Sequence, residues 1–327
     1  MILIGSGFIP VSLSGSALLL VVPLMVLAAL MLDRLLAEPA RCHPLVAFGR
    51  WAAWLEVRLN SPHPARSRLA GWLAMLLALT PWCVVVLLMY LAAAQLWLWL
   101  ILNVLVLYSC IGWQSLQRHV VAVASASDSE QARARLGLIV SRDTQSLSDD
   151  EIAQSACESL LENSTDALFA SLFWFALGGA PAALLHRWVN TLDAMWGYRN
   201  PRFRFFGTPV ARLDDLMAFW PARISAGLFI LVTPRRWLQA VRCWRRQARQ
   251  CASPNGGVVM TTGAGALNIR LSERACYHGQ WKSKPPMGCG PGAGMKDIPR
   301  AVSLVSRSLW LFMGIWLLAA AVAYSVS

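Results

Sequence analysis

Three groups of acidic and amide side chains adjoin apolar stretches of this sequence, where a charged residue is costly and therefore often functional. The groups are Glu158, Glu162, Asn163 and Asp166, then Asn190 and Asp193, and finally Arg212, Asp214 and Asp215. Carboxylate and amide oxygens are hard ligands of the kind that Mg²⁺ takes, commonly one or two carboxylates together with the phosphates of a substrate. The three groups together make a Mg²⁺–phosphate site one of two interpretations that the residues support equally. Solvated helix surface is the alternative for the first group, and it is the favoured interpretation for Glu158 taken by itself.

Two glycine-rich stretches have the composition to approach an anion with their backbone N–H groups. The first is the SPNGG sequence at 253–257, for which an ordinary turn is the favoured alternative. The second, at 281–296, is rich in Gly and Pro and is predicted to be loop. Its Lys282, Lys284 and Lys296 suit phosphate, but a flexible connector is favoured. The five histidines and eight cysteines have no spacing typical of metal ligands.

The elements that must position these groups are strongly apolar. The chain has 327 residues, of which 57% are hydrophobic and 14% charged, whereas a soluble domain carries roughly a quarter charged residues. Charge is absent before Asp33, between Arg68 and Arg118, between Asp166 and Arg187, and after Arg307. A membrane-spanning helix needs about 20 mostly apolar residues. The sequence therefore predicts an all-α, polytopic integral membrane protein with about 4–6 membrane segments, forming a single domain over 1–327.

The predicted segments follow the charge-free windows. They are 14–36, two within 69–113 that turn near Gln95, 167–189, an interrupted segment at 216–234, and 308–326. The first does not have the pattern of a cleavable signal peptide, because no basic residue precedes it and Arg34 follows it. Basic residues mark the cytoplasmic side of a membrane protein. The basic loops at about 37–68 and 235–307 are therefore predicted to be cytoplasmic, and the loop at about 114–166 is predicted to lie on the same side.

The basic excess of the chain is concentrated in one region. The formal net charge is +12, and 235–307 holds 13 basic residues beside only Glu273 and Asp297. Cytoplasmic loops facing anionic lipid are favoured over nucleic-acid binding as the explanation. Within this region, 235–251 is predicted to form an amphipathic helix with Trp on one face and Arg around the rest. Such a helix lies on the membrane surface or extends the preceding segment into the cytoplasm.

The three acidic groups can meet only if the membrane segments do not all cross straight. If 167–189 and 216–234 both cross fully, the 190–215 connector lies on the opposite side from the 114–166 loop. Irregular backbone is tolerated at membrane depth where it is buried in protein or lines a cavity. We therefore expect at least one re-entrant or broken segment, with candidate breaks in the GGAP sequence at 178–181 and the WPAR sequence at 220–223.

Several short motifs, taken in order, form one recognisable pattern. They are Glu38-Pro39 with His43-Pro44; Ser141-Arg142-Asp143-Thr144; Glu162-Asn163 with Asp166; Asn190-Thr191-Leu192-Asp193-Ala194-Met195 with Gly197-Tyr198; Ala211-Arg212-Leu213-Asp214-Asp215 with Pro221-Ala222-Arg223; and Ser253-Pro254-Asn255. With them, the chain from about residue 32 to about residue 310 resembles the adenosylcobinamide-phosphate synthase family of cobalamin biosynthesis, the CobD/CbiB type. Each motif is short, but their joint order and spacing are specific.

The resemblance implies a multi-pass enzyme of the cell (inner) membrane, a carbon–nitrogen ligase. Members of the family attach aminopropanol, usually as its O-phosphate, to a propionate carboxylate of adenosylcobyric acid. The reaction consumes ATP as co-substrate and is expected to require Mg²⁺. The implied partners are thus a corrinoid substrate, aminopropanol or its phosphate, membrane lipid and other membrane enzymes of cobalamin synthesis, with no nucleic acid.

The resemblance also assigns candidate roles to individual residues. The candidate Mg²⁺ ligands or general base for the attacking amine are Glu162, Asp166, Asp193, Asp214 and Asp215. The candidates for binding substrate or nucleotide are Arg142, Asp143, Asn163, Asn190, Arg212, Ser253 and Asn255. The two arginines are candidates for clamping phosphate or carboxylate, because a guanidinium fork matches both.

The chain departs from the family pattern at a few positions. The family often has Asp where Glu38 stands, a Pro-Glu step where Val259-Met260 stand, and a Gly-Gly pair where Ser272-Glu273 stand. The role of the family's Glu is therefore not carried over to Met260. Two other classes stay open at this stage: a non-enzymatic membrane sensor or scaffold of the AmpE type, and an Asp-rich membrane prenyltransferase.

Overall fold

The computed structural model describes residues 15–38, 43–277 and 279–326. Most of the described chain is helical, and its strands are confined to one two-stranded hairpin. The helices group into two compact units, each assembled from segments that are distant in the sequence. Unit 1 comprises the described residues within Met1–Gly112, Asp166–Ala218 and Trp316–Ser327, and unit 2 those within Trp113–Thr165 and Phe219–Ile315.

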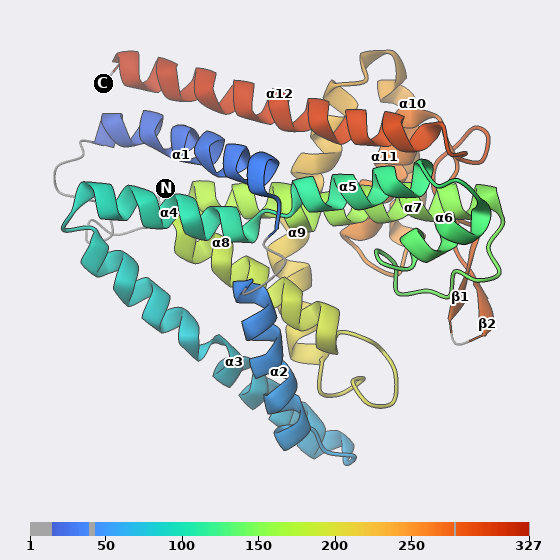
Figure 1. Cartoon of the computed structure of the whole chain (residues 1–327), viewed down its shortest axis with the longest axis horizontal. Helices are drawn as coiled ribbons and strands as arrows, with labels where there is room; N and C mark the ends of the chain where they lie inside the picture. Colours follow the sequence, from blue (N-terminus) through green and yellow to red (C-terminus); the bar gives the residue numbers. More distant parts are fainter. Residues whose placement is uncertain (1–14, 39–42, 278, 327) are drawn as a thin grey trace. The chain divides into compact units, whose positions relative to one another are not determined.

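Unit 1 is built from long apolar helices. They are α1 (Gly15–Leu36), α2 (Pro44–Leu59), α3 (Pro64–Ala92), α4 (Leu96–Cys110), α8 (Ala170–Trp196), the first part of α9 (Thr208–Leu231) and the end of α12 (Asp297–Val326). Helix α4 packs between α1 and α8, and α2 packs on α3 and α8 (Figure 1). Both α2 and α3 begin with proline at the first helical position, where its missing N–H costs nothing and its fixed φ suits the helix.

Helix α8 is broken at the predicted GGAP sequence. Gly178 and Gly179 have non-helical backbone angles, and Gly179 lies at φ 65°, ψ −161°, a region that is essentially restricted to glycine. Two side chains contact the backbone next to the break. Asn103 accepts a hydrogen bond from the Ala180 N–H at 3.2 Å, and Trp82 Nε1 donates to the Pro181 carbonyl at 2.8 Å. The prediction of a broken segment is confirmed.

The second predicted break, at Pro221, is wrong. Helix α9 continues through Pro221, and the chain bends by 99° only after it ends at Leu231. Proline cannot donate to the carbonyl four residues earlier, which here belongs to Met217. Trp174 Nε1 donates to that carbonyl instead, at 3.1 Å. The helix therefore tolerates the proline without leaving a buried acceptor unbonded.

Unit 2 gathers the shorter elements. They are α5 (Trp113–Ala124), α6 (Ser129–Leu136), α7 (Asp149–Ser164), the rest of α9, η3 (Pro234–Arg236), α10 (Trp237–Gln247), η4 (Ala248–Gln250), α11 (Gly256–Leu267), β1 (Arg274–Tyr277), β2 (Gln280–Ser283) and the start of α12. The predicted loop at 281–296 thus begins inside a strand. Helix α7 begins with a capping box, in which Ser148 binds the Glu151 N–H and the Glu151 side chain binds the Ser148 N–H.

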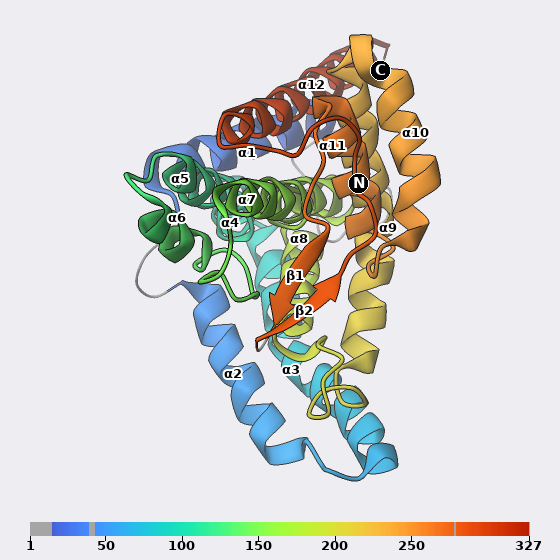
Figure 2. The same ribbon diagram turned by 90° about the vertical axis from the view of Figure 1, so that its right-hand side faces the viewer.

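Helices α10 and α11 lie side by side, as Figure 2 shows. Every residue of α11 is buried. A Cβ added to Gly265 would stand 2.9 Å from the Ala240 Cα and 3.0 Å from the Cys243 Sγ. Only glycine permits this approach, so the small residues of α11 determine how closely α10 packs against it. The helix predicted at 235–251 is confirmed, and it is made up of η3, α10 and η4.

Five helical stretches of the described chain are long and apolar enough to cross a membrane. They are Ala17–Leu36, Pro64–Ala92, Leu96–Ala124, Asp149–Trp196 and Asp297–Val326, and a sixth is added if the bent pair Thr208–Leu231 and Pro234–Gln250 is one span. This confirms the predicted all-α, multi-pass fold and the turn near Gln95. The three predicted loops contain helices of their own: α2 in the first, α5 to α7 in the second, and α10 and α11 in the third. Their cytoplasmic placement stays a prediction.

Candidate functional site

A cluster of carboxylates forms in unit 1 around Asn190. Its Nδ2 lies 3.5 Å from the Asp214 Oδ1, and its side chain also interacts with the Asp166 carboxylate. On a straight helix, Asp166 and Asn190 would be separated by about 36 Å at 1.5 Å per residue. They meet because α8 turns back at its Gly178–Gly179 break. The predicted meeting of the second and third acidic groups with Asp166 is thus explained by one pair of glycines.

The carboxylates in this cluster lie close enough to repel one another. Asp214 interacts electrostatically with Asp166, Asp193 and Asp215, and Asp193 interacts with Asp166 and Asp215. Asp166 lies in η2 (Thr165–Phe169), a single turn of π-helix, a feature that is frequent at functional sites. Crowded carboxylates require a cation, a shared proton or both.

Arg187 supplies a cation that sequence reasoning missed. Its Nη1 donates to the Asn190 Oδ1 at 3.2 Å, and it interacts electrostatically with Asp166. The signal was present in the sequence, because Arg187 is a charged residue in an apolar segment and stands three residues before Asn190. Arg212, by contrast, is exposed on α9, and its predicted role as a clamp stays a prediction.

Two residues of the motif near position 40 lie beside Arg187. A Cβ on Gly112 would stand 2.6 Å from the Glu38 Oε1 and 3.6 Å from the Arg187 Nη2. His43 is buried, and its Nδ1 accepts a hydrogen bond from the Leu45 N–H at 3.1 Å. Burial lowers the pKa of His43 and Arg187 lowers it further, whereas Glu38 opposes them. A neutral His43 bonded in this way carries its proton on Nε2 and acts there as a donor.

The chemistry of the unit 1 donors fits Mg²⁺ shared with a substrate. Four carboxylates and one amide are hard oxygen ligands. Within the described ranges, no three His, Cys, Asp or Glu side chains are close enough to hold a metal ion by themselves. Mg²⁺ commonly takes only one or two carboxylates and completes its shell with phosphate and water. The donors of Asp166, Asp193, Asp214 and Asp215 are therefore suited to a metal that arrives with a phosphorylated substrate.

A second polar site lies wholly within unit 2. It is a cavity of about 540 Å³. The predicted site residues that line it are Arg142, Glu162, Asn163 and Ser253, and other lining residues include Ser141, Glu158, Ser159, Met260, Tyr277, Lys282 and Lys284. The cavity thus brings together the loop before α7, one face of α7, the turn before α11 and strand β2 with the residues after it.

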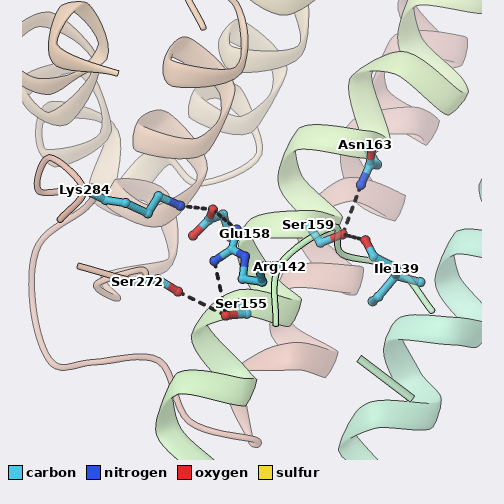
Figure 3. Close-up of polar contacts among 8 residues, drawn as sticks. All are labelled: Ile139, Arg142, Ser155, Glu158, Ser159, Asn163, Ser272 and Lys284. Atoms are coloured by element: carbon cyan, nitrogen blue, oxygen red, sulfur yellow. Dashed lines mark hydrogen bonds and ion pairs between the residues drawn. The ribbon is translucent and has the colours of Figure 1, made fainter. Parts of the chain in front are cut away.

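Glu158 organises one wall of this cavity. Only 2% of it is exposed, and its Oε1 forms an ion pair with the Arg142 Nη2 at 2.6 Å and a second one with the Lys284 Nζ (Figure 3). The interpretation of Glu158 as a solvated surface residue is therefore wrong. Burial lowers the pKa of Lys284, even though Glu158 acts in the opposite direction. Two cations thus share the Glu158 carboxylate, and the Glu162 carboxylate also acts electrostatically on both of them.

Hydroxyl groups on α7 fix the rest of the wall. Ser155 Oγ lies 3.4 Å from the Arg142 Nη1 and 3.3 Å from the Ser272 Oγ. Ser159 donates to the Ile139 carbonyl at 2.9 Å and accepts from the Asn163 amide at 3.0 Å (Figure 3). Ser272, one of the departures from the family pattern, thus supports Arg142 through Ser155.

The turn before α11 is closed by its own side chains. Ser253 Oγ accepts from the Asn255 N–H at 3.3 Å and from the Gly256 N–H at 3.0 Å. Asn255 Oδ1 accepts from the Arg223 Nη1 at 2.6 Å. A Cβ on Gly256 would stand 2.6 Å from the Glu162 Oε1. The lack of a side chain at Gly256 therefore lets the Glu162 carboxylate approach the first residue of α11.

Asp143 lies at the hairpin and does not line the cavity. Its Oδ2 accepts from the Gly279 N–H at 2.8 Å, and its own N–H donates to the Cys276 carbonyl at 2.9 Å. These bonds attach the loop before α7 to β1. Met260, one of the departures from the family pattern, does line the cavity with an apolar side chain.

Comparison with known proteins identifies the family. The model of the family described as CobD/Cbib protein matches residues 26–305. The chain is 46% identical over 302 residues to the cobalamin biosynthesis protein CobD of Chromobacterium violaceum, covering 89% of this chain and 95% of that protein. The chain belongs to the CobD/CbiB family. The CobD of Stutzerimonas stutzeri is also 46% identical, over 303 residues that cover 90% of this chain and 95% of that protein.

A more distant CobD/CbiB relative supports the same conclusion. The probable CobD of Methanothermobacter thermautotrophicus is 37% identical over 257 residues, covering 77% of this chain and 84% of that protein. No solved structure matches the chain. Membership of the CobD/CbiB family places this multi-pass membrane protein in cobalamin biosynthesis, and it does not favour the scaffold or prenyltransferase alternatives.

Proposed function

We propose that the protein joins aminopropanol, or its O-phosphate, to a carboxylate of adenosylcobyric acid in an ATP-dependent reaction at the cell inner membrane. The observation that carries the proposal is the family match over residues 26–305. The cation-lined cavity of unit 2 and the carboxylate cluster of unit 1 support it, because amide formation from a carboxylate needs phosphate binding and a base.

In the proposed reaction, a corrinoid carboxylate oxygen attacks the γ-phosphorus of ATP and ADP leaves. The amine nitrogen then attacks the acyl carbon, loses a proton and expels phosphate. Arg142, Lys282 and Lys284 are proposed to hold anionic groups of the substrates in unit 2, because Arg and Lys cations bind phosphate strongly. Asn163 and Ser253 line the same cavity and are proposed to orient a substrate there.

The carboxylates are proposed to have two roles, as ligands of Mg²⁺ and as the general base. Asp166, Asp193, Asp214 and Asp215 in unit 1, and Glu162 in unit 2, are the candidates to hold Mg²⁺ and to accept the proton of the amine. When bound, Mg²⁺ would neutralise charge that develops on the phosphates during transfer. Asn190 and Arg187 would keep Asp166 and Asp214 in place through the contacts described above.

The direct test is reconstitution with purified protein. With Mg²⁺, ATP, adenosylcobyric acid and aminopropanol phosphate, we expect the amide product with one ADP and one phosphate per bond. Omitting Mg²⁺ should stop the reaction, because the charge on the phosphates would go uncompensated. Mass spectrometry of the corrinoid and coupled detection of ADP are the measurements. In cells, a knockout strain without a redundant enzyme should grow on cobinamide but not on cobyric acid, and growth on both would contradict the proposal.

A pH dependence should follow from Lys284. The Lys284 side chain binds phosphate only in its protonated ammonium form. Burial lowers the pKa of this group below the ordinary value of a lysine, which is about 10.4. The KM for ATP should therefore rise with increasing pH earlier than an ordinary lysine would allow. Lys284→Arg keeps its charge throughout this range and should remove the alkaline rise. An unchanged profile in this variant would exclude Lys284 as the titrating group.

A further inference from the structure

A second cavity in unit 2 lies where α9 ends. Its volume is about 460 Å³, and four arginines line it: Arg235, Arg236, Arg300 and Arg307. The cavity wall also includes Val232, Leu267 and Leu304. Nothing in the proposed reaction uses this cavity, which shares no lining residue with the one around Glu158.

Backbone carbonyls at two helix ends position three of these arginines. Arg236 Nη1 and Arg300 Nη2 both donate to the carbonyl of Leu267, the last residue of α11. Arg307 donates to the carbonyl of Val232, just beyond α9. Cations near helix C-termini are favourable in themselves. A guanidinium has five donors, so these contacts place each arginine while using only part of its capacity.

The local charge is far from balanced. Within the described part of the chain, one of these four arginines forms an ion pair with a carboxylate: Arg300 pairs with Asp297. Guanidinium groups gathered around one cavity repel each other unless an anion lies between them. Phosphate matches the guanidinium fork with two parallel hydrogen bonds. The cavity therefore has the chemistry of a phosphate site.

The surroundings indicate where this phosphate comes from. Leu231 at the end of α9 is 61% exposed, and Trp310 on α12 is 59% exposed. Trp237 and Leu238, just after the 99° bend, are each 50% exposed. Large apolar side chains exposed on membrane helices face acyl chains, and Trp is enriched at the level of the lipid headgroups. A phosphate at this cavity would therefore carry acyl chains.

We propose that this cavity binds the phosphate headgroup of an anionic membrane phospholipid, with the acyl chains alongside α9 and α12. Basic pockets between membrane helices are suited to such headgroups. The site is separate from the proposed catalytic chemistry. It would hold the bent pair α9 and α10 at the membrane surface.

The test uses the full-length protein in nanodiscs of phosphatidylglycerol or of phosphatidylcholine. Native mass spectrometry should detect phosphatidylglycerol retained by the wild type. In Arg300→Gln/Arg307→Gln, its binding should be about thirtyfold weaker, as expected when two interfacial cations are lost. The matched control, Arg242→Gln/Arg246→Gln, removes the same charge from exposed positions on α10 that do not line the cavity, and it should retain the lipid.

A second variant keeps the test decisive if the double variant does not fold. Ser303 lines the cavity and is exposed, so Ser303→Phe should occlude the site while keeping every arginine. It should lose the retained phosphatidylglycerol as well. Equal loss in the α10 control would mean general surface attraction and would overturn the proposal. Retention in Ser303→Phe, or competition of millimolar inorganic phosphate with the lipid, would also overturn it.

Discussion

Replacing Asp214 by Asn is expected to lower turnover about a thousandfold or more, as for the loss of several kcal/mol of transition-state stabilisation. Asp214 contacts Asn190 and interacts with three other carboxylates, so its charge acts on every other carboxylate of the unit 1 cluster. The Asn side chain keeps the shape of Asp but removes the charge that would hold Mg²⁺ or accept a proton. The measurement is the rate of amide and ADP formation by the purified variant. Asp215→Asn is expected to act in the same direction.

Two further measurements separate a functional role of Asp214 from a structural one. The variant should be inserted in the membrane at normal abundance, and its remaining activity should need more Mg²⁺ than the wild type. Asp150→Asn is the matched control, because Asp150 is exposed in the first turn of α7 and should keep wild-type activity. Near-normal turnover of both Asp214→Asn and Asp215→Asn would remove these residues from the site.

Replacing Glu158 by Gln should destabilise the protein by about 3–5 kcal/mol, the usual cost of breaking a buried ion pair. The reason is geometric. Glu158 is shared by Arg142 and Lys284, whose side chains are only 9% and 20% exposed. Without the Glu158 carboxylate, two largely buried cations lose their ion-pair partner and keep only the longer-range interaction with the Glu162 carboxylate. The measurement is denaturant or thermal unfolding of the detergent-solubilised protein.

A double variant distinguishes this mechanism from a simple loss of packing. Glu158→Gln/Lys284→Met removes one of the two cations and should recover part of the lost stability. Glu130→Gln, at an exposed position on α6, is the control and should change stability by less than about 0.5 kcal/mol. If the double variant is less stable than Glu158→Gln, uncompensated charge is not the cause.

The sequence alone was sufficient for the membrane segments. The apolar core of each stretch coincides with a charge-free window, because placing a charged residue in lipid is costly, whereas two stretches begin earlier, at Asp149 and Asp297. Helix α1, the turn at Gln95 and the break at Gly178–Gly179 were therefore predictable from local composition. The same cost made the acidic residues beside these segments recognisable as candidates for function.

Only the tertiary structure decided which polar groups meet. The local sequence indicates a surface position for Glu158, because its partners Arg142 and Lys284 are 16 and 126 residues away. Pro221 is typical of a helix break when only the local sequence is considered. The helix continues because Trp174 binds the Met217 carbonyl that the proline leaves open, and Trp174 is 43 residues earlier in the chain. Asp166 and Asn190 meet because of where α8 turns back. Local propensity reports the preference of a segment for water or lipid, whereas the pairing of buried polar groups depends on segments that the chain brings together from far apart.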